Sequence, residues 1–111
     1  DGRVAVDWRP PAWAIDAEGT VDPGVIWGAL DCASGWYVCA DGEVPVSFTA
    51  QYAVEVVRPL VPDGVYAIVA WSGDGAARWE GRKRTAAAAA FDGEGRLIAR
   101  ARSLWIAPKA G

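Results

Sequence analysis

Asp31 is the residue in this chain whose type and position most strongly suggest chemistry. It is the only formally charged side chain in residues 23–40, a stretch that otherwise has the apolar character of a buried helix. Removing an ionised carboxylate from water is costly unless partners satisfy it, so a solitary acid in such a helix is a candidate functional group. A surface position or a structural hydrogen bond is the competing interpretation, and the sequence alone leaves both open.

The remaining residue types narrow the chemistry. The chain has no His and two cysteines, Cys32 and Cys39, which gives zinc too few ligands. Seven positions along one helix separate these thiols by about 10 Å, beyond disulfide reach, so we expect free thiols that pack as small apolar side chains in a reducing cytosol. The net charge is -3 and the basic residues are dispersed apart from Arg82, Lys83 and Arg84, which argues against nucleic acid as a partner.

A long helix must position Asp31. Asp22 is a favourable N-cap and Pro23 a favourable first helical residue, so the helix is expected to begin there and to end near Asp41 and Gly42. Because this helix is apolar nearly all round, it should be covered on most of its faces. A curled sheet is the expected cover.

Five segments have the apolar pattern of strands that could form this sheet. They are residues 3–9, 46–58, 65–71, 79–91 and 96–106. The sequence at 92–95 is a hairpin signal between the last two. The run Ala86–Ala90 has high helix propensity, but its shortness and the turn signals around it favour a strand, whose small side chains would let the helix lie close to the sheet.

Alternation within the expected strands predicts which side chains face the core. In 46–58 the even-numbered apolar positions share one face, whereas Ser47, Thr49, Gln51 and Glu55 are expected on the other. In 96–106 the arginines share one face and the apolar residues the opposite one, so one side would meet the core and the other water or a ligand.

Length and composition are those of one domain. The 111 residues, of which 52% are hydrophobic, fit a single domain over 1–111 with a substantial core. No signal peptide opens the sequence, and three glycines with a central aspartate make 23–40 a poor membrane span, so we expect a cytoplasmic protein without a membrane partner. The abrupt start in strand-like sequence leaves room for a natural chain that extends before Asp1.

The order of a strand, a long acid-bearing helix and four antiparallel strands resembles the hotdog fold, an α+β architecture in which about five antiparallel strands wrap around one central helix. The closest resemblance is to the single-domain acyl-CoA thioesterases of the phenylacetate-pathway type. Their fingerprint is an Asn, a short loop with Gly, a His-Gly-Gly opening of the helix and an acid seven residues after the second Gly. This spacing places Asp16 at the Asn, Gly19 and Thr20 in the loop, Asp22 at the His, Pro23 and Gly24 at the two Gly positions and Asp31 at the acid.

Downstream residues extend the resemblance over nearly the whole chain. Thr49 falls at the Ser/Thr position of the strand after the helix, ten residues before a matching Pro59. Residues 80–82, Glu-Gly-Arg, resemble the Gly-Arg turn into the fourth strand, and residues 91–99 resemble the last hairpin.

The resemblance implies hydrolysis of an acyl-CoA or a similar acyl thioester, with no cofactor beyond the coenzyme A of the substrate. Asp31 would be the base or nucleophile, the Gly24 backbone N–H would receive the oxyanion, and Thr49 would orient the water or the acid. In the resembling enzymes the acid and the Gly come from opposite subunits, which implies a homodimer or homotetramer.

Further residues are expected to contact substrate. The resemblance places Asp16 and Asp22 beside the thioester, and cationic side chains suit the phosphates of coenzyme A, although a solvated turn is the commoner meaning of a short basic run. The basic run consists of Arg82, Lys83 and Arg84. Trp27 and Trp36 could line an acyl pocket, although core or subunit interface is the commoner place for Trp.

The departures from the fingerprint keep other functions open. Asp22 replaces a His, and as an N-cap its carboxylate would occupy the donors that should receive the substrate oxygen, which would slow hydrolysis. The alternative is a non-catalytic hotdog module that binds acyl thioesters or serves as an oligomeric scaffold, with Asp31 merely hydrogen bonded. Hotdog hydratases generally use an Asp and His pair, and the absence of His argues against that activity.

Overall fold

The computed structural model describes residues 4–39, 48–72 and 82–107. Its elements, in chain order, are β1 (Val4–Trp8), the short 3-10 helix η1 (Ala12–Ala14), α1 (Gly24–Cys39), β2 (Phe48–Val56), β3 (Tyr66–Ser72), β4 (Lys83–Phe91) and β5 (Leu97–Ile106). The expected strands and helix are therefore confirmed. The expected helix end at Asp41 and Gly42, the face of Ser47, and the turn residues Glu80 and Gly81 lie outside the described residues.

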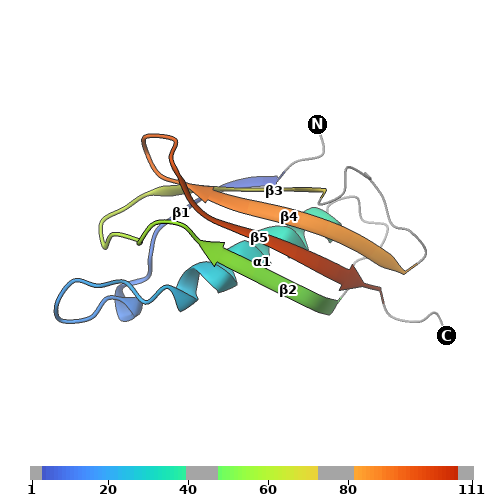
Figure 1. Ribbon diagram of the computed structural model, residues 1–111, viewed down its shortest axis with the longest axis horizontal. Helices are drawn as coiled ribbons and strands as arrows, with labels where there is room; N and C mark the ends of the chain where they lie inside the picture. The colour runs from blue at the N-terminus through green and yellow to red at the C-terminus, as the bar shows by residue number, and fades with distance from the viewer. Residues whose placement is uncertain (1–3, 40–47, 73–81, 108–111) are drawn as a thin grey trace.

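The five strands form one antiparallel sheet in the order β1-β3-β4-β5-β2. The sheet curves around α1, which crosses one of its faces (Figure 1). We call the face toward α1 the inner face and the opposite one the outer face. β1 and β2 are the two edges of this sheet, so β2, which follows the helix in sequence, has a strand partner only on its β5 side among the described residues.

Small side chains at the centre of the sheet let the helix lie close to it. All five residues of Ala86–Ala90 are buried in β4, so the prediction of a strand for this run is confirmed. Ala86, Ala88 and Ala90 belong to the core with Ile26 and Leu30 of α1, whose side chains are fully buried. Burial of the Ile26 and Leu30 side chains, each contributing about 1.5–3 kcal/mol when fully buried, fixes the helix against the sheet.

The helix begins as its sequence predicts. The carboxylate of Asp22 accepts a hydrogen bond from the Gly24 N–H at 2.9 Å, which is the geometry of an N-cap to the second helical residue. The predicted cap is therefore confirmed. Its carboxylate occupies the Gly24 N–H, which is the amide that the resemblance assigns to the substrate oxyanion.

One face of the helix is not covered in the described chain. Trp27 is 43% exposed and Gly24, Gly28 and Cys32 are exposed as well. The expectation that the helix is covered on most faces and that Cys32 packs as an apolar residue is thus wrong for these residues. The sheet reaches around the flanks of α1 but leaves the face opposite Ile26 open.

The hairpin at the end of the chain forms as predicted. Asp92 N–H donates to the Arg96 carbonyl, and Gly95 adopts a φ of 79°, which favours glycine. The Asp92 carboxylate accepts the backbone N–H groups of Glu94 and Arg96 and the Arg96 guanidinium. These hydrogen bonds, the Arg96 amide first, hold the pKa of Asp92 below its ordinary value.

The described part of the chain offers no helical stretch with the length and apolarity that crossing a membrane requires.

Candidate functional site

The carboxylate of Asp31 lies on the flank of α1 that faces β2. Its side chain is partly buried, and its Oδ1 accepts a hydrogen bond from the Thr49 hydroxyl at 3.3 Å. The structure thus brings together two of the residues that the sequence proposes as catalytic. A carboxylate held by one hydroxyl keeps most of its acceptor capacity for other groups.

A bulge in β2 makes this contact. Thr49 pairs with Trp105 and Gln51 with Leu104, so two residues of β2, Thr49 and the bulged Ala50, are accommodated where β5 provides one. Directly paired residues share a face, and Trp105 belongs to the core. Thr49 therefore points to the inner face. The expectation that Thr49 points away from Tyr52 is wrong, because the extra residue shifts the alternation of β2 by one position.

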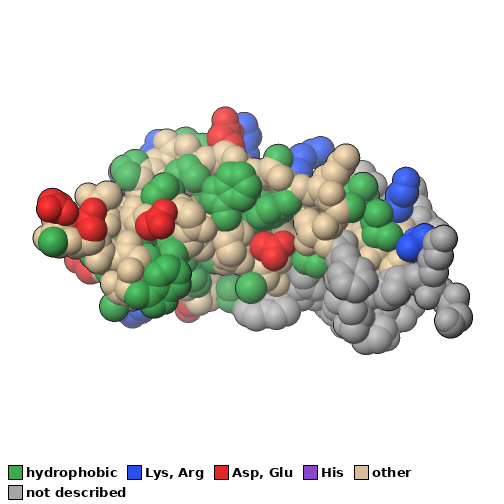
Figure 2. All heavy atoms as spheres, turned by 90° about the horizontal axis from the view of Figure 1, so that it is seen from below, with side chains coloured by type: hydrophobic (Ala, Val, Ile, Leu, Met, Phe, Trp, Pro, Cys, Tyr) green, Lys and Arg blue, Asp and Glu red, His purple; other side chains and the backbone are tan. Residues whose placement is uncertain are grey.

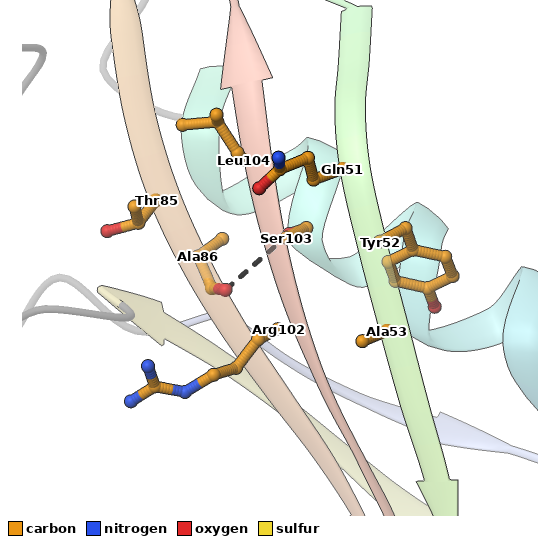
Figure 3. Close-up of a pocket in the computed structure, with 8 residues that line it drawn as sticks. All are labelled: Gln51, Tyr52, Ala53, Thr85, Ala86, Arg102, Ser103 and Leu104. Carbon is orange, nitrogen blue, oxygen red and sulfur yellow. Dashed lines mark hydrogen bonds between the residues drawn. The ribbon is translucent and has the colours of Figure 1, made fainter.

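Tyr52 is a further member of the site. Its hydroxyl donates to the backbone carbonyl of Trp27 at 2.5 Å, and its ring meets the Trp27 ring edge-on, with centroids 5.7 Å apart and planes at 81°. Figure 3 shows Tyr52 and Gln51 leaving opposite sides of β2. Burial raises the pKa of the Tyr52 hydroxyl above its ordinary value of 10.0, and the charge of Asp31 and then the thiol of Cys32 raise it further.

The predicted oxyanion donor is occupied by the chain itself. The Gly24 N–H, in the first turn of α1, donates to Asp22 rather than pointing freely at a ligand. A helix N-terminus attracts anions through its unsatisfied amides and its dipole, and here a side chain takes that role.

Gly24 and Asp31 do not meet within one chain. Seven residues along an α-helix correspond to about 10 Å of rise. A thioester carbonyl cannot contact both groups at that separation. The two proposed catalytic groups are therefore on one exposed helix face but at different ends of it.

A hollow of about 420 Å³ opens beside Gly24. It lies between the helix and the end of β1, and Gly24 and Gly28 line it without side chains. Trp8 and Trp13 form its apolar walls, and Trp13 is 80% exposed. Seen from the β2 side of the molecule, hydrophobic side chains gather over the middle of the face, with acidic side chains among them (Figure 2).

The other predicted substrate contacts are dispersed. Asp16 Oδ1 accepts the N–H groups of Glu18 and Thr20 and so closes its own loop. Within the basic run, Arg82 donates to the Ala107 carbonyl and Lys83 is exposed, whereas Arg84 is buried.

The three side chains of the basic run do not converge. Successive strand residues face opposite sides, and Arg84 pairs with Trp105 of the inner face. It lies two strands, roughly 10 Å, from Thr49 across the sheet. Trp36 lies on α1, outside the residues whose side chains are described.

A second hollow, of about 360 Å³, is on the outer face over β4, β5 and β2 (Figure 3). Gln51, Thr85, Arg102 and Leu104 line it, and Ser103, whose hydroxyl donates to the Ala86 carbonyl at 3.5 Å, lies at its floor. None of the catalytic candidates and none of the basic run 82–84 lines this hollow. Arg102 does, and it belongs to the arginine face of 96–106 that the sequence predicts to meet water or a ligand. In residues 4–39, 48–72 and 82–107, no three His, Cys, Asp or Glu side chains gather as a metal site would require.

The sequence did not indicate Tyr52 as a site residue, and it did not indicate the bulge that turns Thr49 inward. Tyr52 stands at an apolar position of an alternating strand, which is the pattern of a core residue. No Gly or Pro marks the bulge at Ala50, so the sequence carries no recognisable signal for it.

Comparison with known proteins establishes the fold. No model of a protein family matches the sequence, and no curated protein matches it. Among solved structures, an Asp-to-Ala variant of a hypothetical thioesterase protein from Streptococcus pneumoniae TIGR4 matches with a TM-score of 0.83 and 17% identity, over 99% of this chain and 86% of that one. The hypothetical thioesterase protein with coenzyme A from the same organism matches with a TM-score of 0.83 and 19% identity, over 96% of this chain and 82% of that one.

The PaaI protein from the phenylacetic acid degradation operon of E. coli matches with a TM-score of 0.81 and 12% identity, over 99% of this chain and 75% of that one. At such identities the likeness shows the fold. The predicted hotdog fold, with its antiparallel sheet around one helix, is therefore confirmed.

The proximity of Asp31 and Tyr52 predicts a coupled titration. We expect Asp31→Asn to lower the pKa of Tyr52, because the nearby negative charge that disfavours tyrosinate is removed. Since the folded state raises this pKa, Tyr52 contributes stability that is present below pH 10.0 and is lost as the pH rises further. The ¹³C shift of Tyr52 Cζ, followed against pH, measures the change. Asp63→Asn, in an exposed loop, is the control, and identical titrations for the parent and Asp31→Asn would contradict the assigned proximity.

Proposed function

We propose that the protein hydrolyses acyl-CoA or a similar acyl thioester, with Asp31 as the base or nucleophile. The observation that carries the proposal is the Asp31 carboxylate, partly buried on an exposed helix face and held by the Thr49 hydroxyl. The fold supports it, since solved structures of this fold include proteins described as thioesterases, one of them with coenzyme A. Two of those structures are variants of the hypothetical thioesterase from Streptococcus pneumoniae TIGR4, one with an Asp and the other with a Thr replaced by Ala.

The chemistry follows from the carboxylate. Asp31 takes a proton from water, or attacks the carbonyl itself, and the oxyanion that forms needs amide donors. If Asp31 acts as a base, collapse of the intermediate breaks the carbon–sulfur bond, the proton held by Asp31 passes to the leaving thiolate, and a carboxylic acid and a thiol result. If Asp31 attacks the carbonyl, the same cleavage releases the thiolate and leaves a mixed anhydride on Asp31, which water hydrolyses to the carboxylic acid and the free carboxylate. The hydrogen bond from Thr49 to Oδ1 orients the carboxylate so that Oδ2 is available for the water or the carbonyl.

The oxyanion donor in this proposal is the Gly24 N–H of a second copy, because one chain keeps Gly24 and Asp31 about 10 Å apart. An antiparallel pair of α1 helices that joins these groups has its two-fold axis midway between them, beside Trp27 and Gly28. Two observations suit such a pair. A Cβ at Gly28 would meet no atom within 4 Å in a single chain, and β2 is a sheet edge that a second strand could extend. A homodimer, or a tetramer of two such dimers, is the proposed assembly.

The hollow beside Gly24 is the proposed place of the acyl group. Apart from Asp22, its lining of aromatic rings, small side chains and glycines is apolar and allows close approach to the helix backbone. Arg82 and Lys83, both exposed, are proposed to meet the phosphates of coenzyme A, while Asp16 and Asp22 would border the thioester. The exposed free thiol of Cys32 fits a cytoplasmic location.

One observation favours a second candidate function, a non-catalytic hotdog module that binds acyl thioesters or acts as a scaffold. The Asp22 carboxylate occupies the Gly24 N–H and adds negative charge where an oxyanion would form. For hydrolysis, the substrate oxygen has to replace this carboxylate as the acceptor of the Gly24 N–H. If it does not, the site binds without turning over.

Replacement of Asp31 separates the two functions. Asp31→Asn should reduce thiol release from a panel of short, medium and aromatic acyl-CoAs by at least about a hundredfold, because an amide can neither accept the proton nor attack the carbonyl. Asp63→Asn should leave the rate unchanged. Equal rates for the parent and Asp31→Asn, or no turnover of any substrate by the parent, would favour the binding module.

The cap at Asp22 predicts opposite effects on stability and turnover. Asp22→Ala frees the Gly24 N–H, so kcat/KM should rise by about tenfold while the free energy of unfolding falls by about 1 kcal/mol. Asp22→Asn keeps a capping oxygen on the Gly24 N–H and should retain the stability of the parent. Its kcat/KM should rise less than that of Asp22→Ala, because only the negative charge is removed. Thiol release and denaturant unfolding measure the two quantities. A fall in kcat/KM for Asp22→Ala would show that the capping role dominates.

The proposed helix crossing is tested at Gly28. Gly28→Arg should convert the dimer to monomers and abolish thiol release, since a long side chain cannot fit where two helices meet. Folding should persist because Arg has a higher helix propensity than Gly. Analytical ultracentrifugation and circular dichroism check both points, with Gly93→Arg in the exposed hairpin as the control. A dimeric, active Gly28→Arg variant would exclude this crossing.

A further inference from the structure

We infer that Tyr52 is a positioning residue for Asp31. The helical turn that carries the carboxylate contacts β2 at two points, and the phenol of Tyr52 makes one of these contacts. This inference rests on the proposed function and deepens it. It assigns to Tyr52 a role that neither its place in an apolar strand pattern nor the likeness to other proteins indicates.

The first point of contact is the carbonyl of Trp27. The Tyr52 hydroxyl donates to this oxygen at 2.5 Å. In an α-helix the carbonyl four residues before a position accepts the amide of that position, so the Trp27 carbonyl belongs to the turn that ends at Asp31. The phenol therefore attaches β2 to the peptide that defines where the Asp31 backbone lies.

The second point of contact is the carboxylate itself, through Thr49. The distance of 3.3 Å between Thr49 Oγ1 and Asp31 Oδ1 is long for a hydroxyl hydrogen bond, which is commonly 2.7–2.8 Å, and both groups have access to solvent. This bond alone would hold the carboxylate weakly. The shorter bond from Tyr52, which fixes the backbone, is the stronger of the two restraints.

The bulge places both contacts on one face. Thr49 and Tyr52 are three residues apart, a spacing that puts side chains on opposite faces of a regular strand. The extra residue at Ala50 brings both to the inner face, toward α1. At this spacing, both contacts with the helical turn thus depend on the same β-bulge.

The phenol is suited to act as a lasting donor. Its ring packs edge-on against Trp27, which restricts rotation of the side chain. The hydroxyl is protonated at neutral pH because its ordinary pKa is 10.0, and burial and the neighbouring charge of Asp31 raise this pKa further, so the bond to the Trp27 carbonyl is maintained.

The test removes one atom. Tyr52→Phe keeps the ring and its packing but not the hydroxyl. Tyr66→Phe is the matched control, because Tyr66 is buried and its hydroxyl accepts a hydrogen bond from the Val61 N–H, away from Asp31. Amide hydrogen exchange of Asp31, relative to that of Ile68 in β3, reads out the local restraint without reference to activity. We expect this ratio to rise about tenfold in Tyr52→Phe and to stay constant in Tyr66→Phe. An unchanged ratio in Tyr52→Phe would overturn the inference.

Kinetic measurements of thiol release provide a second test of the inference. Thiol release by Tyr52→Phe should show kcat lowered by about tenfold with KM nearly unchanged, because a misplaced group affects the chemical step more than binding. In an Asp31→Asn background the same substitution should have no further effect, since Tyr52 acts through Asp31. An additive effect in that background, or full activity of Tyr52→Phe, would contradict the inference. If the parent hydrolyses no thioester, the proposed function fails, and the exchange ratio still decides whether Tyr52 positions Asp31.

Discussion

The close approach of α1 to the sheet is the constraint on which the rest of this structure depends. It is possible because β4 presents alanines where larger residues would hold the helix away, and Ile26 and Leu30 are then fully buried against them. A helix at this depth brings its flank within reach of the edge strand β2, so that Thr49 and Tyr52 contact it. The core composition thus sets the distance between the acid and its neighbours.

The N-terminus of the helix shows how one set of amides can serve two purposes. Its unsatisfied N–H groups need an acceptor for the helix to be stable, and the same groups are what a developing oxyanion requires. In this chain Asp22 satisfies the first need directly. Under the proposed function, stability of the isolated chain and the binding of an oxyanion at Gly24 therefore oppose each other.

Most of the fold could be predicted from the sequence because its signals are local. Asp22 and Pro23 mark the helix start, the hairpin sequence marks the last turn, and alternation identifies the strands. The inner contacts of β2 could not be predicted, because alternation assumes a regular strand and the bulge at Ala50 breaks it without a Gly or Pro to signal it. The exposure of Cys32 was not predictable either, because an apolar helix carries no information on which of its faces the sheet leaves open.

Likewise, the sequence placed Asp31 and Gly24 on one helix and could anticipate their separation, whereas Tyr52 gave no sign of its role. A tyrosine on the apolar side of a strand is ordinary, and only the position of its hydroxyl relative to the Trp27 carbonyl distinguishes it.

The bulge also has a genetic consequence. Loss of the single codon for Ala50 would restore a regular strand in which Thr49 still lies opposite Trp105. Thr49 would then stand two residues before Tyr52, so both side chains would still point to the inner face. The core, which takes Tyr52 and Val54 from the unaffected half, would be preserved. A relative that lacks this codon could therefore keep the acid beside its hydroxyl partner, with the two β2 residues that contact the helix two positions apart rather than three.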